Sequence, residues 1–436
     1  MEHNLQLLYN FEMFPEDYLK LSILLFFMFL YYLQLNKNKV LPFFFLNHFI
    51  ILIYIFLSLF LIEKGIYLSE LDRIGFNNNS FYIWSVFAII FIIILNYSHS
   101  FSCGVLIPNL KPRLFIFIYF SSIVFTYLYV GSLDTSTHSK ASVFAQDVGP
   151  LGMTVTMKIL TYTKNLINIA FNYYLVLSRK KYFYILSFLY LLESILIVNS
   201  LSPLYSLLFI ILSRFAIINR GFKLKPIHII LFVVFVSFRL YTRMENFGMG
   251  QSFMAQLLLF ERFAGQGELF WVSIHESYQG NLSNVFFSFW DNFLSFRNAA
   301  INVDYGFGHF MFSVNPSVAK QFIDSGLSWT SGFPGINIYY YGLLLGGIIF
   351  VILTLFIMKL YQLYIEILLG KNVFVFIAYF IVFQYVVTDY YGMGESTRFN
   401  MRTVFYLVLF LLLYYGTIQD FFLKIFRNSY QKSILT

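Results

Sequence analysis

Long apolar runs recur from one end of this sequence to the other, and their length restricts how the chain can fold. A helical run of about 17 to 25 apolar residues matches the roughly 30 Å hydrocarbon core of a bilayer. We expect about eleven such spans, at residues 18–35, 40–62, 81–101, 114–131, 163–178, 183–199, 203–219, 226–241, 336–358, 373–389 and 403–418.

The composition excludes an ordinary water-soluble domain. Apolar residues make up 59% of the 436-residue chain and charged residues only 11%, whereas soluble proteins carry about 25% charged residues. Most of the surface must therefore face lipid. The expected fold is all-α: a polytopic integral membrane protein with about 11 transmembrane helices and one large loop on the outer side.

Basic residues distinguish the two sides of the predicted bundle. With the connections assigned alternately, one side receives 15 of the 29 basic residues but only two of the 21 acidic ones, Glu366 and Asp420. The positive-inside rule makes that side the cytoplasm, which places the N-terminus outside and the C-terminus inside. The same rule accounts for the net charge of +8, so we expect no nucleic-acid partner. Glu2 and Glu12 stand where a leader would be basic, so no cleaved leader is expected.

One outer connection is far longer than the others. It divides the chain into an N-terminal transmembrane bundle (1–241), the large loop (242–335) and a C-terminal transmembrane bundle (336–436). A structureless loop of this length is uncommon, which indicates a folded element with a function. The loop also holds three of the four tryptophans of the chain.

Several kinds of site are excluded by what the sequence lacks. Cys103 is the single cysteine, so there is no disulfide framework and no cysteine-rich metal site. The sequence has neither a His-Glu-x-x-His motif nor a Walker or dinucleotide glycine motif. We therefore expect no bound metal and no cofactor.

Arginines on the outer side are candidates for phosphate binding, because the guanidinium group can donate two hydrogen bonds to phosphate oxygens at once. The candidates are Arg243, Arg262, Arg297, Arg398 and Arg402. Structural alternatives remain open. Arg239 and Arg243 could reach the interface from the end of a span, and Arg262 could form a surface ion pair with Glu261. Arg398 and Arg402 could pair with Asp389 or Glu395.

Two charged residues fall well inside predicted spans, away from their ends. Glu193 lies in the span at 183–199, and Arg214 lies in the next one. Because an uncompensated charge is costly in hydrocarbon, we expect these two to pair with each other, with a transport or catalytic role as the alternative. His275 and His309 in the long loop are candidate acids or bases near neutral pH.

Glycine and aromatic motifs after the long loop resemble those of a known family. The loop ends in Ser331-Gly-Phe-Pro-Gly335, and the next span begins with Tyr341-Gly342 and Gly346-Gly347. A further element runs from Thr397 to Arg402 before the last span. Together with the order of spans and the single large outer loop, these motifs resemble the Wzy-type polymerases of O-antigen and related surface polysaccharides.

The resemblance implies a reaction at the periplasmic face of the bacterial inner membrane, in which a growing glycan moves from undecaprenyl diphosphate to a second lipid-linked repeat unit. The implied partners are the undecaprenyl diphosphate-linked glycan donor and acceptor, membrane lipid and a chain-length regulator protein. The outer arginines would bind the leaving diphosphate without a metal. The base would come from Glu245, Glu261, Asp304 or His309, with Glu268, Asp291 and His275 as further candidates.

One position departs from the family pattern, because Pro203 stands where an arginine is expected. Two other functions also fit the architecture. A lipid-linked oligosaccharide flippase would need internal repeats and charged side chains around a mid-membrane cavity, and we find no clear repeat. An O-antigen ligase would share the outer loop and the lipid donor. A deletion strain distinguishes them: single-unit surface glycan indicates a polymerase, unattached polymer a ligase, and intermediates at the cytoplasmic face a flippase.

Overall fold

The computed structural model describes residues 3, 4, 7, 12–37, 39–68, 71–97, 110–131, 151–193, 214, 217, 267–276, 314–317, 320, 335–370, 372–390 and 408. Within them the chain is mostly helical, as the sequence predicts, with one short antiparallel hairpin. In chain order the elements are α2 (Pro15–Leu35), α3 (Leu41–Phe44), α4 (Leu46–Glu63), β1 (Tyr67–Leu68), β2 (Arg73–Ile74), α5 (Ser80–Tyr97), α6 (Arg113–Gly131), α8 (Leu151–Leu177), α9 (Lys180–Glu193), α13 (Glu268–His275), α17 (Gly335–Leu369) and α18 (Val373–Tyr390).

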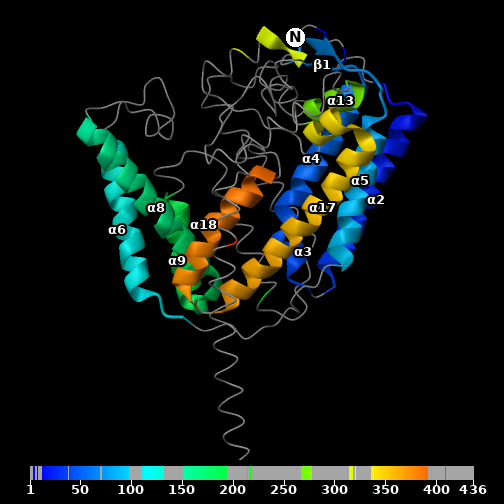
Figure 1. The fold of residues 1–436 in the computed structure, drawn as a ribbon. Coiled ribbons are helices and arrows are strands. Elements are labelled where there is room, and N and C mark those ends of the chain that lie inside the picture. Colours follow the sequence, from blue (N-terminus) through cyan, green and yellow to red (C-terminus); the bar gives the residue numbers. More distant parts are fainter. Residues whose placement is uncertain are drawn as a thin grey trace, which may run out of the picture.

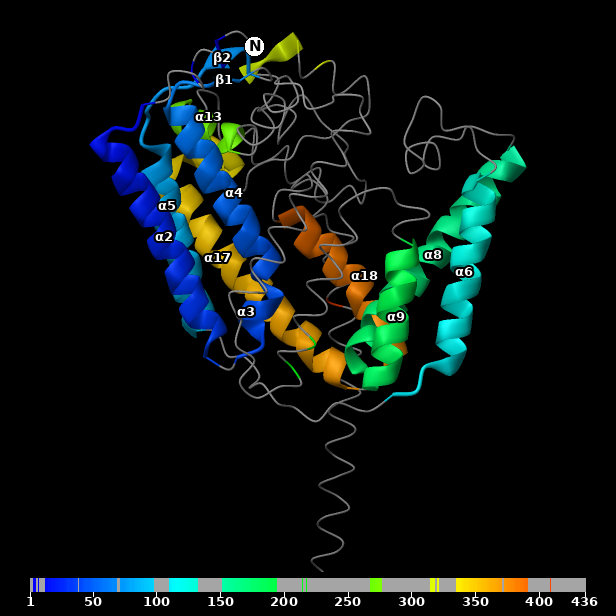
Figure 2. The same ribbon diagram turned by 180° about the vertical axis from the view of Figure 1, so that it is seen from behind.

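The helices form two groups that diverge toward one end of the molecule (Figures 1 and 2). Helices α2, α3, α4, α5 and α17 form one group, and α6, α8 and α9 form the other. Helix α18 contacts both α17 and α8 and so joins the groups. Helix α13 and the β1–β2 hairpin lie at the end toward which the groups diverge, which we call the α13 end.

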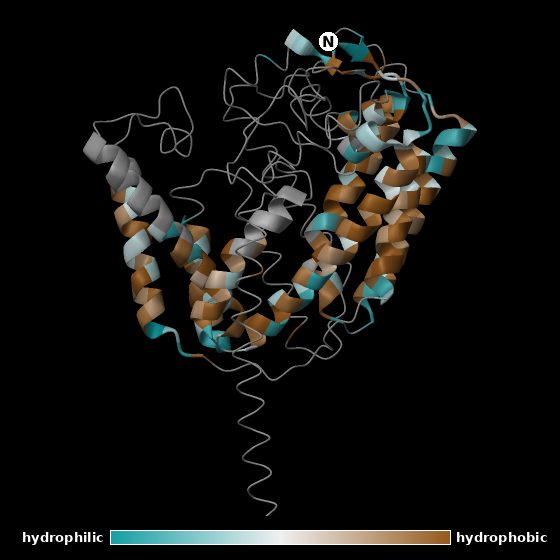
Figure 3. Ribbon diagram, in the orientation of Figure 1, coloured by the Kyte–Doolittle hydropathy of each residue, from teal (hydrophilic) through white to brown (hydrophobic). Residues whose placement is uncertain are grey.

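Among the residues that the structure describes, three helices are long and apolar enough to cross a membrane: Pro15–Leu35, Ser80–Tyr97 and Asn337–Leu369. Apolar residues dominate their outward faces as well as their packed ones (Figure 3). Exposed apolar side chains at this density are typical of helices that face lipid rather than water. Shorter apolar helices add to the bundle at His48–Glu63, Arg113–Leu128 and Leu166–Leu177.

Every predicted span that falls within the described residues contains a helix, but two of the boundaries are wrong. Helix α8 begins at Leu151, inside the outer connection that the sequence predicts at 132–162. The predicted boundary is wrong because the first turns of α8 are rich in threonine and lysine, which are typical of a polar connection. Helix α17 continues past 358 to Leu369. The spans at 203–219, 226–241 and 403–418 lie outside the described residues, so the total of eleven stays a prediction.

Two helices begin at well-defined caps at the α13 end. Pro15 is the first residue of α2, a position where its fixed φ suits the helix and its missing N–H is not needed. The Phe14 N–H donates to Asp17 Oδ2 at 2.7 Å. At the start of α5, the Ser80 N–H donates to Asn78 Oδ1 at 3.1 Å. These contacts satisfy backbone donors that have no partner within their own helix.

Aromatic rings connect the helices within the first group. Tyr31 of α2 stacks on Phe49 of α4 with the ring centroids 3.9 Å apart. Trp84 of α5 makes an edge contact with Phe270 of α13 at 5.0 Å, and its Nε1 donates to the Leu52 carbonyl at 3.3 Å. The contact of Trp84 with Phe270 makes α13 part of the packed core. Such aromatic pairs contribute about 0.5–1.5 kcal/mol beyond their buried area.

Helix α17 is broken close to its start. Gly342 has φ +77° and ψ 172°, a conformation that is essentially restricted to glycine. The short helical piece before it folds back, so a Cβ at Gly346 would lie 3.0 Å from the backbone of Asn337. A Cβ at Gly335 would lie 2.7 Å from the hydroxyl of Ser273 in α13. The glycines of the motif therefore permit a sharp bend and close packing against α13.

Candidate functional site

Most of the residues that the sequence nominates for phosphate binding and proton transfer lie outside the described part of the chain. They are Arg243, Glu245, Glu261, Arg262, Asp291, Arg297, Asp304, His309, Arg398 and Arg402. Their roles therefore stay predictions. Of the long loop, the structure describes residues 267–276, which include α13, and a few positions at 314–317 and 320.

Helix α13 is inserted into the end of the bundle and does not project from it. It packs against α4, α5 and α17, and its residues from Glu268 to Ser273 are buried. The Gly267 N–H donates to Ser58 Oγ at 2.7 Å. Glu268 is only 3% exposed, so its carboxylate is not accessible to a sugar hydroxyl and it is a poor candidate for the base. His275 is exposed at this end and remains a candidate acid or base.

The connection between α4 and α5 holds α13 in place. The Trp271 indole donates from Nε1 to the Phe76 carbonyl at 3.0 Å, and the Asn78 side chain donates to the Trp271 carbonyl at 3.1 Å. Arg73, in strand β2, forms an ion pair with Glu276 just after α13. These contacts join residues about 200 positions apart in the sequence. The β1–β2 hairpin and α13 therefore form one unit at this end.

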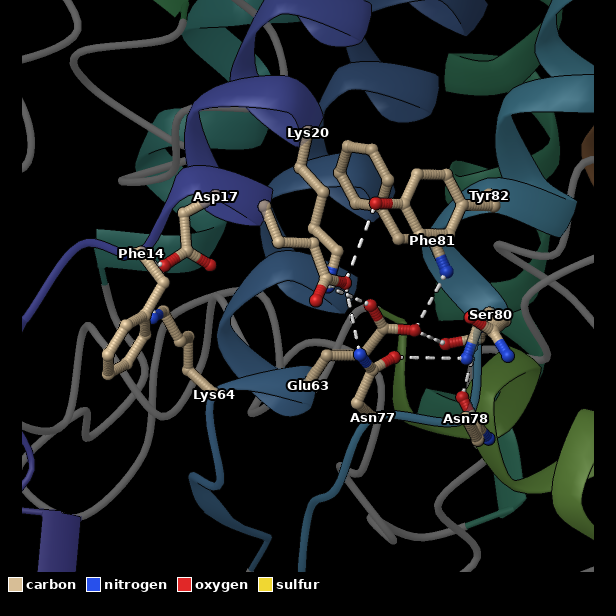
Figure 4. Close-up of polar contacts among 12 residues, drawn as sticks. Phe14, Asp17, Lys20, Glu63, Lys64, Asn77, Asn78, Ser80, Phe81 and Tyr82 are labelled. Carbon is tan, nitrogen blue, oxygen red and sulfur yellow. Dashed lines mark hydrogen bonds and ion pairs between the residues drawn. The ribbon is translucent and has the colours of Figure 1, made fainter.

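A set of paired charges, which we call the end network, connects α2, α4 and α5 (Figure 4). Its members are Glu16, Asp17, Lys20, Glu63 and Lys64. The Lys20 ammonium lies 2.8 Å from Glu63 and 3.0 Å from Glu16. The other Glu63 oxygen accepts hydrogen bonds from the Ser80 hydroxyl and the Phe81 N–H, each at 3.0 Å. The two remaining members pair with each other, so every charge in the network has a partner.

A second set of polar residues, the mid-bundle network, lies between α6, α8 and α9. Its members are Tyr119, Ser122, Lys164 and Glu193. The Lys164 ammonium lies 2.7 Å from one Glu193 oxygen and 3.4 Å from the Ser122 hydroxyl. The Tyr119 hydroxyl donates to the other Glu193 oxygen. The side chains of Lys164 and Glu193 are 13% and 6% exposed, which makes this a largely buried pair.

The mid-bundle network also lies deep along its helices. Lys164 and Glu193 are each about 20 Å along the helix axis from the end of the bundle opposite α13, at a rise of 1.5 Å per residue. Ionisable residues at such depth in a membrane bundle are costly and usually functional. The network is therefore the strongest candidate for a functional site among the residues that the structure describes.

The expected pairing of Glu193 with Arg214 is wrong. The Arg214 guanidinium instead donates to the carbonyl oxygens at the end of α8, namely those of Leu175 at 3.0 Å, Val176 at 2.5 Å and Ser178 at 2.6 Å. The last carbonyls of a helix lack partners within it and carry the negative end of the helix dipole. Arg214 therefore caps α8, and the charge of Glu193 is compensated by another residue.

That other residue is Lys164, which the sequence analysis did not single out. It stands at the beginning of the span predicted at 163–178, where a lysine would be ordinary at a membrane surface. Because α8 actually begins at Leu151, Lys164 lies in the middle of the helix. A helical pattern that continues upstream of residue 163 would have been the signal in the sequence that α8 begins earlier.

Comparison with known proteins adds no assignment. No family model, curated protein or solved structure matches the chain. Within the described ranges, no group of three or more His, Cys, Asp or Glu side chains is arranged to hold a metal ion. A function is therefore inferred from the motifs of the sequence and from the geometry of the two ends and the middle of the bundle.

Proposed function

We propose that this protein is a membrane glycosyltransferase that polymerises undecaprenyl diphosphate-linked repeat units into O-antigen or a related surface polysaccharide. The observation that supports the proposal most is the packing around Gly335, Gly342 and Gly346, the glycines on which the family resemblance depends. They allow the start of α17 to bend and to pack closely on α13, a helix of the long outer segment. Such packing anchors that segment at the bundle end, beside the membrane surface where a lipid diphosphate would lie.

The proposed reaction needs positive charge and one base. An acceptor hydroxyl attacks the anomeric carbon of the donor glycan, the bond from that carbon to the diphosphate oxygen breaks, and the diphosphate leaves with the electron pair. The arginines that the sequence predicts on the outer side would stabilise the leaving charge. The hydroxyl proton would pass to a carboxylate or histidine of the long segment. The energy comes from the lipid diphosphate, so no nucleotide or metal is needed.

The proposal is tested by replacing Arg398 or Arg402 with alanine and profiling the surface glycan of the cells. Loss of diphosphate contacts should abolish long chains while single repeat units remain attached. The matched control is Arg73→Ala, which removes an arginine that the structure places at the α13 end and pairs with Glu276. Unchanged chain length in both arginine variants would contradict their assignment, and unattached polymer would indicate a ligase.

A second candidate function, a lipid-linked oligosaccharide flippase, is favoured by the mid-bundle network. Transporters place charged residues near the middle of the bilayer, where they face the substrate path. Lys164 and Glu193 form a pair at that depth between α8 and α9. A polymerase that works at the membrane surface has no need for such a pair other than to hold its helices together.

The double variant Lys164→Met/Glu193→Leu separates these two functions. It removes both charges at once, so neither is left unpaired, and such replacements are often neutral for stability. A flippase would lose activity and accumulate repeat units at the cytoplasmic face. A polymerase in which the pair is structural would still produce long chains at the normal protein level.

A further inference from the structure

Five basic side chains form a rim at the end of the bundle opposite α13. The rim consists of Lys111, Arg113, Arg179, Lys180 and Lys181, and all five are exposed. Backbone hydrogen bonds hold its two segments side by side, because the Leu110 N–H donates to the Leu177 carbonyl at 3.3 Å and the Arg179 N–H donates to the Leu110 carbonyl at 3.2 Å. The start of α6 and the turn from α8 to α9 therefore present one continuous cationic edge.

No acidic residue offsets this charge within the rim, because residues 110–113 and 178–182 contain no aspartate or glutamate. The Arg113 Nε donates to the Tyr182 hydroxyl at 3.1 Å, across the two segments. This hydrogen bond, together with the charges of Arg113, Lys181 and Lys111, lowers the pKa of Tyr182. Several cations therefore act on the same small region of the surface.

Exposed apolar side chains continue from the rim along the two helices. Phe117 lies one turn beyond Arg113 on α6, and Tyr184 and Phe188 lie one and two turns beyond Lys180 on α9. Residues four apart share a helix face, so each stripe runs directly from a cation. Helices α6 and α9 contact each other, and the ribbon coloured by hydropathy shows hydrophilic residues at their lower ends and apolar ones above (Figure 3).

We propose that the basic rim and these two apolar stripes bind an anionic phospholipid, with the headgroup phosphate on the rim and the acyl chains along α6 and α9. The cations match the anionic headgroup of a lipid and the apolar side chains match its acyl chains. An acidic protein would contact the cations of the rim but not the apolar stripes. The inference does not depend on the proposed polymerase function.

Two other lysines at the same end provide the matched comparison. Lys37 donates to the Asn96 side-chain oxygen at 2.5 Å, and Lys39 donates to the Asn96 carbonyl at 3.4 Å. These two ammonium groups are already held by protein oxygens and lie between α2 and α5, away from α6 and α9. They carry the same charge as Lys180 and Lys181 but lack the neighbouring rim.

The experiment measures phosphatidylglycerol binding to the purified full-length protein by native mass spectrometry in detergent at low salt. Lys180→Gln/Lys181→Gln should raise the apparent Kd about 30-fold, since each cation contributes roughly fivefold. Lys37→Gln/Lys39→Gln should raise it less than about threefold. Equal effects of the two pairs, or equal binding of phosphatidylcholine, would overturn the proposal.

A second arm distinguishes a lipid from a free phosphate group. Phe117→Ser/Phe188→Ser should weaken phosphatidylglycerol binding and leave binding of soluble glycerophosphoglycerol unchanged, because only the lipid contacts the stripes. If glycerophosphoglycerol binds as tightly as the lipid, the rim is a simple anion site and the lipid assignment fails. Thermal unfolding of each variant reports whether the fold is intact, which is expected for exposed positions.

Discussion

The end network and the mid-bundle network each hold a buried lysine against a glutamate, but they differ in what else supports the carboxylate. Glu63 forms an ion pair with Lys20 and accepts hydrogen bonds from the Ser80 hydroxyl and from the N–H of Phe81, in the first turn of α5. The first N–H groups of a helix have no partner inside it and can serve a carboxylate. The Glu193 carboxylate faces the interior of α6 and α8, where backbone donors are already used within the helices, and its described partners are the side chains of Lys164 and Tyr119.

The carboxylate of Glu63, near a helix end, is therefore supported by a hydroxyl and a backbone N–H besides its lysine, whereas the described support of Glu193 comes from side chains only. The side chain of Lys20 is 4% exposed and that of Glu63 is 0% exposed, so this pair is at least as buried as the pair of Lys164 and Glu193. Burial alone therefore does not distinguish the two pairs. We expect the number of independent donors to determine how sensitive each network is to mutation.

The largest effect is expected for Lys164→Met. Of the described partners of the Glu193 carboxylate it leaves the Tyr119 hydroxyl, and breaking a buried pair by removing one partner costs about 3–5 kcal/mol. Unfolding in detergent, followed by the fluorescence of the tryptophans, measures the loss. The double variant Lys164→Met/Glu193→Leu should recover most of it, and a double variant as unstable as the single one would show that packing, not charge, is responsible.

Lys20→Met should cost less, about 2 kcal/mol, although its lysine is the more buried of the two. Glu63 keeps the Ser80 hydroxyl and the Phe81 N–H, and Glu16 is half exposed and can be solvated. The same unfolding assay compares it directly with Lys164→Met. A cost equal to or above that of Lys164→Met would reverse the comparison between the two networks.

Tyr119→Phe should destabilise the protein by about 1.5 kcal/mol, the usual contribution of a hydrogen bond to a charged group. Ser80→Ala is its counterpart in the end network and should cost about 1 kcal/mol or less, because the Phe81 N–H remains. Unfolding midpoints of the two variants, measured side by side, test whether redundancy protects Glu63. Equal losses would mean that it does not.

The smallest effect is expected for Arg73→Ala. The side chains of the Arg73–Glu276 pair are 36% and 28% exposed, and ion pairs of this kind contribute about 0–1 kcal/mol. High salt should reduce even this difference, because exposed charges are screened. A loss above 2 kcal/mol that persists in salt would place this pair with the buried networks and would make the hairpin a main support of α13.

The helical class, and a helix at each predicted span that the structure describes, could be predicted from the sequence, because apolar runs of membrane-spanning length are a strong local signal. The packing of α13 could not, since it depends on contacts between residues about 200 positions apart. The glycines after the long loop form a motif in the sequence, but only the structure shows why glycine is needed, at the bend of Gly342 and at the close approach of Gly335 to α13.

The partner of Glu193 could not be predicted for a similar reason. Hydropathy placed the start of α8 about twelve residues too late, which put Lys164 at a predicted membrane surface. Opposite charges in neighbouring spans then made Arg214 the natural partner of Glu193. An arginine can donate to the free carbonyl oxygens at a helix end as well as to a carboxylate. Sequence patterns do not show which of these two acceptors it contacts.

The bend in α17 has a consequence that concerns handedness. A Cβ at Gly342 would meet no atom within 4 Å, so alanine fits the space and only the torsion angles exclude it. The same angles with their signs reversed are ordinary extended backbone for an L-amino acid. At this one position the chain adopts the mirror image of a common shape, so L-alanine would strain the bend, whereas the D-enantiomer would find its own preferred conformation there.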